Sequence, residues 1–171
     1  LLDRNQKYLT EIILKTLKTK INFFIKDVYE ENNRLFLNFG HTFAHAIEMA
    51  TDIHIKEDYL RHGEAVALGI LSELYLSKLE TKSVMQKKKI EKIYNLTALI
   101  LEKFKLPIKL ILPKKISKAT MLSKIYSAVF KDKKRISKKP RYIKLLDIGK
   151  SEVSEIQNFD NINNTIHHIL N

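Results

Sequence analysis

Two stretches of the sequence decide the fold, RLFLNFGHTFAHAIE at residues 34–48 and HGEAVALG at residues 62–69. Apolar residues in and just after the first stretch recur at spacings of three and four, as on one face of an α-helix: Phe43, Ala46, Ile47 and Ala50. The second stretch continues to residue 80 and is apolar almost all round from Ala65 to Leu76, which is typical of a buried helix. We therefore expect an amphipathic helix that begins near Gly40, and after it a helix that is buried on most sides.

The rest of the chain predicts further helices and little else. Periodic apolar positions predict helices over residues 4–26 and 84–104, a third from a Ser117 cap to about Phe130, and a weak tail helix over residues 161–170. The segment RYIKLLDIG, bounded by Pro140 and Gly149, predicts a small β element near residues 141–148. Residues 28–34 and 51–61 are polar or mixed and predict loops. We expect a mainly α-helical fold in which residues 1–171 form one domain.

Composition sets limits on compartment and partners. The sequence has no cysteine, which excludes disulfides and thiolate metal sites and fits a cytoplasmic protein. It contains no run of about 18 apolar residues, so we expect no membrane association. The net charge is +12, and residues 87–150 hold 20 of the 31 basic residues but 4 of the 19 acidic ones. This excess has three interpretations: a lysine-rich composition, a nucleic-acid surface, or a site for a phosphate-bearing small substrate. We favour the first and expect no nucleic acid.

The candidate chemistry is concentrated in residues 34–69. His41 and His45 are four residues apart, so they lie on one face of the predicted helix, where imidazoles can share a ligand or a metal. His62 begins the buried helix, and Arg34, Asn38 and Glu48 are nearby in sequence. Polar groups set among apolar helices need partners. A bound metal would supply them, but hydrogen-bonded structural histidines remain the alternative.

The two stretches together resemble the paired signature of the 3-dehydroquinate synthases, members of the sugar-phosphate cyclases. In that signature an R…LNxGHTFGHAIE segment precedes an HGEAVAxG segment. Lys20 and Asp27 match the preceding helix of the family, and the DKK of residues 132–134 with RYIKLL after it resembles a later element. The resemblance implies the helical C-terminal domain of the dehydroquinate synthase and iron-containing alcohol dehydrogenase-like fold. It also implies a homodimeric phosphate lyase that uses NAD and Zn²⁺ or Co²⁺ to convert 3-deoxy-D-arabino-heptulosonate 7-phosphate into 3-dehydroquinate and phosphate, a step of the shikimate pathway.

The resemblance assigns roles to individual residues. His41 and His62 would be metal ligands, and the substrate site would contain Lys20, Arg34, Asn38, His45 and Lys133. The first four of these would also be catalytic, with His45 exchanging a proton. Lys20, Arg34 and Lys133 suit a sugar-phosphate substrate that carries both a carboxylate and a phosphate.

This sequence departs from the family pattern in three ways. Ala44 stands where the family usually has glycine, and the interval from His41 to His62 is a few residues longer than usual. The NAD-binding domain of the family, with a glutamate metal ligand and a lysine, precedes the part that matches here, and the four glycines contain no GxGxxG motif. We therefore expect this chain alone to be inactive and to need an upstream NAD-binding domain or subunit. The alternatives are a related cyclase of the inosose or valiolone synthase type and a non-catalytic basic helical module.

Five further residues receive expectations from their positions. His54, in the longer interval, is expected to have no functional role, and His167 and His168 are expected to face solvent. Glu48 and Glu64 have two open interpretations, as partners that orient an imidazole or as residues of helix starts and the surface.

Overall fold

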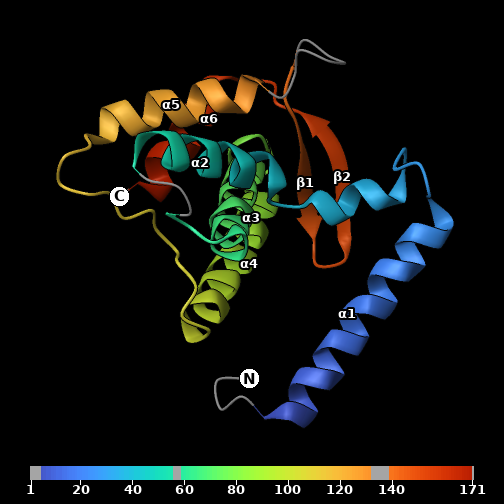
Figure 1. Ribbon diagram of the computed structural model, residues 1–171. Coiled ribbons are helices and arrows are strands. Elements are labelled where there is room, and N and C mark those ends of the chain that lie inside the picture. The colour runs from blue at the N-terminus through green and yellow to red at the C-terminus, as the bar shows by residue number, and fades with distance from the viewer. Residues whose placement is uncertain (1–4, 56–58, 132–138, 171) are drawn as a thin grey trace. The chain divides into compact units, whose positions relative to one another are not determined.

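The computed structural model describes residues 5–55, 59–131 and 139–170, and these form helices with one small sheet (Figure 1). The chain divides between Asn38 and Phe39 into two compact units. The first unit contains helix α1 (Gln6–Lys26) and a 3-10 helix, η1 (Asn33–Asn38), which contact each other. Asn5 caps the start of α1, because its Oδ1 accepts a hydrogen bond from the Lys7 amide at 3.0 Å.

The second unit is built from five helices and a β-hairpin among the described residues. In chain order these are α2 (His41–His54), α3 (His62–Leu79), α4 (Val84–Lys103), α5 (Lys118–Lys131), β1 (Arg141–Asp147), β2 (Lys150–Glu155) and α6 (Asp160–Ile169). The mainly α-helical fold with a β element near residues 141–148 is confirmed. The predicted loop over residues 51–61 is wrong at its start, because α2 continues to His54 and the buried Thr51 hydroxyl bonds to the Ile47 carbonyl within the helix.

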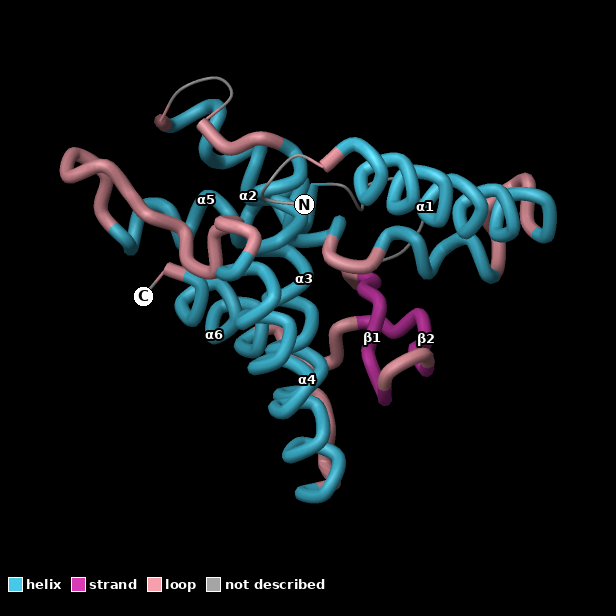
Figure 2. The backbone as a smooth tube through the Cα atoms, turned by 90° about the horizontal axis from the view of Figure 1, so that it is seen from below, coloured by secondary structure: helices cyan, strands magenta, loops and turns pink. Residues whose placement is uncertain are grey.

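Helix α3 is the centre of the second unit. It contacts α2, α4, α6 and β1 (Figure 2). Ten of its 18 residues are buried, as the apolar sequence predicted. Its buried hydroxyls are satisfied within the helix: Ser72 donates to the Leu68 carbonyl at 2.8 Å and Ser77 to the Glu73 carbonyl at 2.7 Å. These two serines therefore lie in the core without leaving a donor unpaired.

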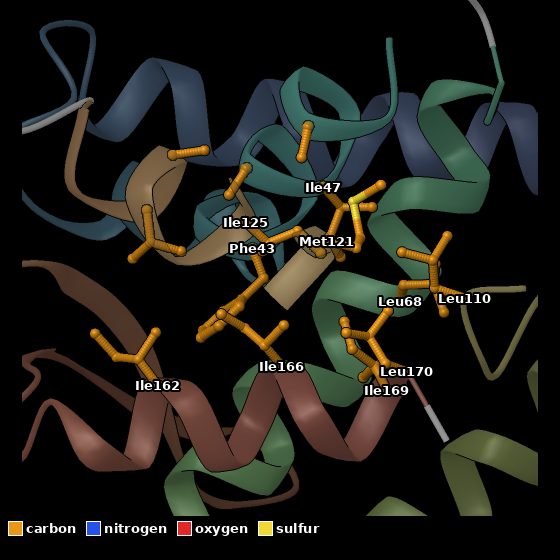
Figure 3. Packing of buried hydrophobic residues seen from close by; sticks show 14 of the residues in the cluster. Phe43, Ile47, Leu68, Leu110, Met121, Ile125, Ile162, Ile166, Ile169 and Leu170 are labelled. Carbon is orange, nitrogen blue, oxygen red and sulfur yellow. The ribbon is translucent and has the colours of Figure 1, made fainter. Parts of the chain in front are cut away.

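The apolar core lies between α2, α3, α5 and α6 (Figure 3). The labelled side chains of Figure 3 converge from these four helices and from the loop before α5, and none is more than 5% exposed: Phe43, Ile47, Leu68, Leu110, Met121, Ile125, Ile162, Ile166, Ile169 and Leu170. The Leu110 amide also donates to the Ile169 carbonyl at 2.8 Å, which ties that loop to α6. Each fully buried aliphatic or aromatic side chain contributes about 1.5–3 kcal/mol, so this core fixes how α2 lies on α3.

The hairpin packs its first strand against the helices. β1 pairs antiparallel with β2, from Arg141 opposite Glu155 to Asp147 opposite Lys150. β1 lies on the side of the hairpin that faces α3 and α4 (Figure 1). Its residues Tyr142 and Ile143 are buried. β2, of sequence KSEVSE, has no buried residue, so its place in the sheet comes from pairing with β1.

His168 lies differently from the prediction. Its ring stacks on Tyr75 of α3, with centroids 4.0 Å apart and planes 3° from parallel, and its Nε2 is 2.9 Å from the Tyr94 hydroxyl. Burial, followed by the charges of Lys109 and Lys78, lowers the pKa of His168 to about 4. The expectation that His168 faces solvent is therefore wrong, because α6 lies on α3 and brings this side of the tail helix against two tyrosines.

Candidate metal and substrate site

The structure brings three imidazoles of the second unit together. His41 is the first residue of α2, His45 lies one turn later, and His62 is the first residue of α3. Their ring centroids are 5.5 Å apart for His41 and His45, 5.6 Å for His41 and His62, and 6.1 Å for His45 and His62. His45 and His62 are exposed and His41 is half-buried. We call these three side chains the histidine cluster, and a ligand can approach it from solvent.

Two rings of the cluster are held through the same nitrogen. His62 Nδ1 is 2.9 Å from Glu48 Oε1, and His41 Nδ1 is 3.3 Å from the Phe39 carbonyl oxygen. A carbonyl oxygen only accepts hydrogen bonds, so His41 carries a proton on Nδ1 when this bond forms. Each ring then keeps its Nε2 lone pair for another partner, the arrangement in which a metal-binding histidine is usually found.

The spacing of these rings fits a shared cation after small rotations. With metal–nitrogen bonds of about 2.0–2.1 Å, two imidazoles at a tetrahedral angle have centroids about 5 Å apart. The 5.6 Å between His41 and His62 is slightly longer. In agreement with that excess, no group of three or more His, Asp and Glu side chains in the described part of the chain is already arranged to hold a metal. The ligand roles of His41 and His62 remain predictions.

The two glutamates with open interpretations have different roles. Glu48 is on α2 and bonds to His62, so it orients an imidazole. Glu64 Oε2 instead accepts a hydrogen bond from the Arg61 amide at 2.8 Å, which satisfies a free donor at the start of α3. Only Glu48 is therefore part of the histidine cluster's surroundings.

The start of α2 depends on two glycines. Gly40 precedes His41 with a φ of 86°, a left-handed conformation that favours glycine. Gly69 of α3 packs directly on it: a Cβ added at Gly69 would lie 2.0 Å from the Gly40 carbonyl oxygen. This close approach of two backbones places the first turn of α2, and with it His41, at a fixed point along α3.

The predicted substrate residues Arg34 and Asn38 lie together in the first unit. Arg34 donates from Nη1 to the Val28 carbonyl at 2.8 Å, and its guanidinium is 5.1 Å from the centre of the Phe24 ring. Glu30 joins the two residues, because its carboxylate is 3.3 Å from Arg34 Nη2 and accepts from Asn38 Nδ2 at 2.5 Å. Sequence reasoning missed Glu30, because it lies outside any helix, in a predicted loop where a spacing of four residues is no signal of contact.

Asp27, which matched the family pattern, has a structural role in the same unit. Its carboxylate accepts backbone hydrogen bonds from Glu31, Asn32 and Arg34 at 2.7–3.0 Å and so closes the turn after α1. These bonds, that of Arg34 above all, lower the pKa of Asp27. Asp27 therefore shapes the segment from which Arg34 extends.

The two predicted lysines are not placed against a ligand. Lys20 is an exposed residue of α1, and Lys133 lies outside the described residues. The convergence of Lys20, Arg34 and Lys133 on one anion site stays a prediction.

Comparisons with known proteins identify the family. The second unit is helical and carries a solvent-facing group of histidines at the starts of two helices. Residues 1–135 match the family model described as 3-dehydroquinate synthase C-terminal. The chain belongs to this family.

Curated relatives carry the same name. The chain is 36% identical over 164 residues to a 3-dehydroquinate synthase of Vesicomyosocius okutanii, covering 96% of this chain and 40% of the relative. It is 37% identical over 142 residues to a 3-dehydroquinate synthase of Campylobacter jejuni subsp. doylei, covering 82% of this chain and 35% of the relative. The chain thus spans about two fifths of the length of these relatives.

A solved structure shares the fold. The crystal structure of a 2-deoxy-scyllo-inosose synthase, complexed with carbaglucose-6-phosphate, NAD⁺ and Co²⁺, superimposes with a TM-score of 0.63 at 20% identity. The match covers 96% of this chain and 42% of that one.

Proposed function

We propose that this chain supplies the metal- and substrate-binding part of a 3-dehydroquinate synthase, which converts 3-deoxy-D-arabino-heptulosonate 7-phosphate into 3-dehydroquinate and phosphate. The main support is the histidine cluster, with its Nε2 atoms left free, in a chain of the 3-dehydroquinate synthase C-terminal family. The complete enzyme would be a cytoplasmic homodimer in which residues 1–171 form the C-terminal domain. None of the described helices is long and apolar enough to cross a bilayer.

His41 and His62 would hold a Zn²⁺ or Co²⁺ ion through Nε2, with further ligands from water, substrate and a carboxylate outside this chain. When bound, such a cation binds hydroxyl oxygens and makes their protons more acidic. The chain's own contribution is to present neutral imidazoles in fixed tautomers, which Glu48 and the Phe39 carbonyl secure. Two imidazoles without the carboxylate should bind a cation weakly.

NAD would be bound outside this chain, because the glycines here have other roles. Gly40 and Gly69 serve the contact between α2 and α3, Gly63 lies in the first turn of α3, and Gly149 lies in the hairpin turn. When bound, NAD supplies a temporary acceptor for a hydride from the substrate. Positioning of reactants is worth about 7–11 kcal/mol of barrier, so free NAD cannot replace a bound one, and the chain alone should be inactive.

The remaining residues would bind the substrate and move protons. Arg34 and Lys20 would bind its carboxylate and phosphate, and Arg34 can do so because a guanidinium has five N–H donors, of which the Val28 and Glu30 contacts use only some. His45 has no hydrogen-bond partner among the described residues, so its ring is available to accept and return a proton. Asn38 and Lys133 would complete the substrate contacts.

Two alternative functions make different demands on the chain. A related cyclase of the inosose or valiolone type would act on a sugar phosphate without a carboxylate, and would need fewer cations. A non-catalytic basic module would need free lysines, whereas several lysines of the second unit are paired with acids, as Lys78 is with Glu91 and Lys89 with Asp147. The heptulosonate lyase therefore remains the preferred proposal.

The test is phosphate release from the heptulosonate phosphate, with NAD and Zn²⁺, by two proteins. One is this chain alone, and the other is a fusion in which the unmatched upstream part of the Vesicomyosocius okutanii relative precedes residue 1. We expect turnover by the fusion and none by the chain alone. Glucose 6-phosphate, offered in parallel, tests the inosose-type alternative.

The matched control uses two histidines of one helix. His41→Ala in the fusion should abolish turnover, whereas His54→Ala, at the last residue of α2 and outside the histidine cluster, should leave most of it. Equal activity of the two variants, or turnover by the chain alone, would show that the proposal is wrong.

A further inference from the structure

Glu73 is a buried acid in the middle of α3 that sequence reasoning did not single out. Its side chain is 0% exposed, and it lies one helical turn beyond Gly69 on the same face. The nearest histidine in sequence, His62, is about 16 Å away along the helix axis. The signal in the sequence was a carboxylate inside a helix that is apolar almost all round, and such a group needs a reason to be there.

The carboxyl group of Glu73 lies where three elements meet. Oε2 accepts a hydrogen bond from the Ile143 amide of β1 at 3.2 Å. The amides of Gly40 and Thr42, at the start of α2, also favour the ionised form of the acid. Oε1 has no hydrogen bond of good geometry. Thr42 completes the junction, because its hydroxyl donates to the Arg141 carbonyl of β1 at 3.0 Å.

Helix α2 has no cap of its own. The first amides of a helix point outward without partners, and a preceding Ser, Thr, Asp or Asn side chain usually satisfies one of them. Gly40 has no side chain that could do so. A polar oxygen from another element can lie near these amides instead. Glu73 brings a carboxyl group from α3 to the first turn of α2, next to the Gly40 and Thr42 amides, and bonds at the same point to the Ile143 amide of β1.

We propose that Glu73 is a positioning residue that holds the first turn of α2 on α3 and β1, and so sets His41 at the distance from His62 at which the two rings take a divalent cation. The metal-binding part of this inference rests on the proposed function. The positioning part does not, because it concerns the histidine cluster without any ligand.

The proton state of Glu73 suggests which substitution preserves the junction. Burial raises the pKa of Glu73 to about 8, against the opposing effect of the nearby amides, so the acid is mostly neutral at pH 7. Glutamine has a similar shape, is neutral, and keeps an oxygen that can accept from the Ile143 amide. Leucine fills similar space and has no polar group.

The experiment compares Glu73→Gln and Glu73→Leu by two measurements on the 171-residue chain. The first is the NMR nuclear Overhauser contact between the rings of His41 and His62, whose centroids are 5.6 Å apart. The second is titration with Co²⁺, followed by its visible absorption spectrum. We expect Glu73→Gln to keep both signals, and Glu73→Leu to lose the ring contact and to bind Co²⁺ about tenfold or more weakly.

Ser72→Ala is the control for a merely structural effect. Ser72 is the neighbouring residue, is also 0% exposed, and bonds only to the Leu68 carbonyl of its own helix. The Ser72→Ala substitution should lower the melting temperature without changing the contact between the His41 and His62 rings or the Co²⁺ spectrum. If Glu73→Leu does not fold, Glu73→Asp, which shortens the reach of the acid by one methylene, takes its place with the same expected losses.

The possible results separate the two proposals. A folded Glu73→Leu or Glu73→Asp variant with an unchanged ring contact overturns the positioning role. If the unaltered chain shows the ring contact and binds no Co²⁺ while the variant loses the contact, the positioning role stands and the metal site of the proposed function fails.

Discussion

Glu73 should make a large contribution to the pH dependence of stability between pH 5 and 9. In the unfolded chain this carboxyl ionises near its ordinary value of 4.5, whereas burial raises the pKa in the folded protein to about 8. Between these two values the folded protein holds one more proton than the unfolded chain, so the free energy of unfolding falls as pH rises. The contribution is fully present below pH 4.5 and is lost as pH rises through 8.

The size of the effect follows from the two pKa values. A difference of about 3.5 units corresponds to about 5 kcal/mol, of which about 4 kcal/mol falls between pH 5 and 9. Glutamine at this position does not titrate, so the Glu73→Gln variant should lack this loss. The unfolding free energy of the variant minus that of the unaltered protein should therefore be several kcal/mol larger at pH 9 than at pH 5.

The assay is urea unfolding followed by circular dichroism, because the sequence has no tryptophan. The quantity to plot is the difference in unfolding free energy between the two proteins against pH, since all other titrating groups are common to both. Ser72→Ala, which replaces a buried group that does not titrate, should give a curve parallel to that of the unaltered protein. Parallel curves for Glu73→Gln would refute the reasoning, because they would mean that Glu73 is already ionised in the folded protein at neutral pH.

Four other substitutions give sharp expectations. Gly69→Ala should cost about 3 kcal/mol or more, since its Cβ would lie 2.0 Å from a backbone oxygen, whereas Gly63→Ala, with nothing within 4 Å of the new Cβ, should gain up to about 1 kcal/mol in the same urea assay. His168→Phe should remove a loss of stability on acidification. The pKa of His168 is lowered in the folded protein, so its contribution to stability is present above pH 6.5 and is lost as pH falls toward 4. Melting temperatures that change equally in both proteins between pH 7 and pH 4.5 would contradict this. Glu48→Gln should weaken Co²⁺ binding about tenfold, because His62 loses the carboxylate that holds its ring, and calorimetric titration showing unchanged affinity would contradict that role.

The helices were predictable because their apolar periodicity is a local property of the sequence. The predicted limits of α1, α3, α4 and α5 differ from those observed by a few residues at most. The Ser117 cap is also confirmed, since its hydroxyl accepts from the Thr120 amide at 3.1 Å. β2 was not predicted, because its polar sequence has no apolar alternation and its pairing with β1 is a tertiary fact.

The environment of His168 was not predictable for a related reason. The sequence NINNTIHHIL indicates a helix with one apolar face, and His168 follows Ile166 by two positions, away from the centre of that face. Two tyrosines from α3 and α4 nevertheless meet it there. Which surface of a helix is covered depends on what packs beside it, and the pattern of one helix does not contain that information.

The candidate site combines a local pattern with a contact between helices. His41 and His45 share a face because they are four residues apart, which the sequence alone establishes. That His62 joins them requires α2 and α3 to pack in a particular register. Family resemblance predicted the grouping, but the physical cause appears only in the structure.

Two contacts fix that register. Gly40 touches Gly69 at one end of the pair, and Glu48 bonds to His62 at the other. The two points are eight residues apart on α2 and seven apart on α3, or about 12 and 10 Å along the helix axes, so the helices run antiparallel with matched spacing. A shift of one residue along either helix would move the glycines out of contact and drive a side chain into a backbone. His41 and His45, which lie between these points on α2, therefore keep their position relative to His62 while the glycine contact holds, so Gly69, two turns after His62, helps to place the histidine cluster.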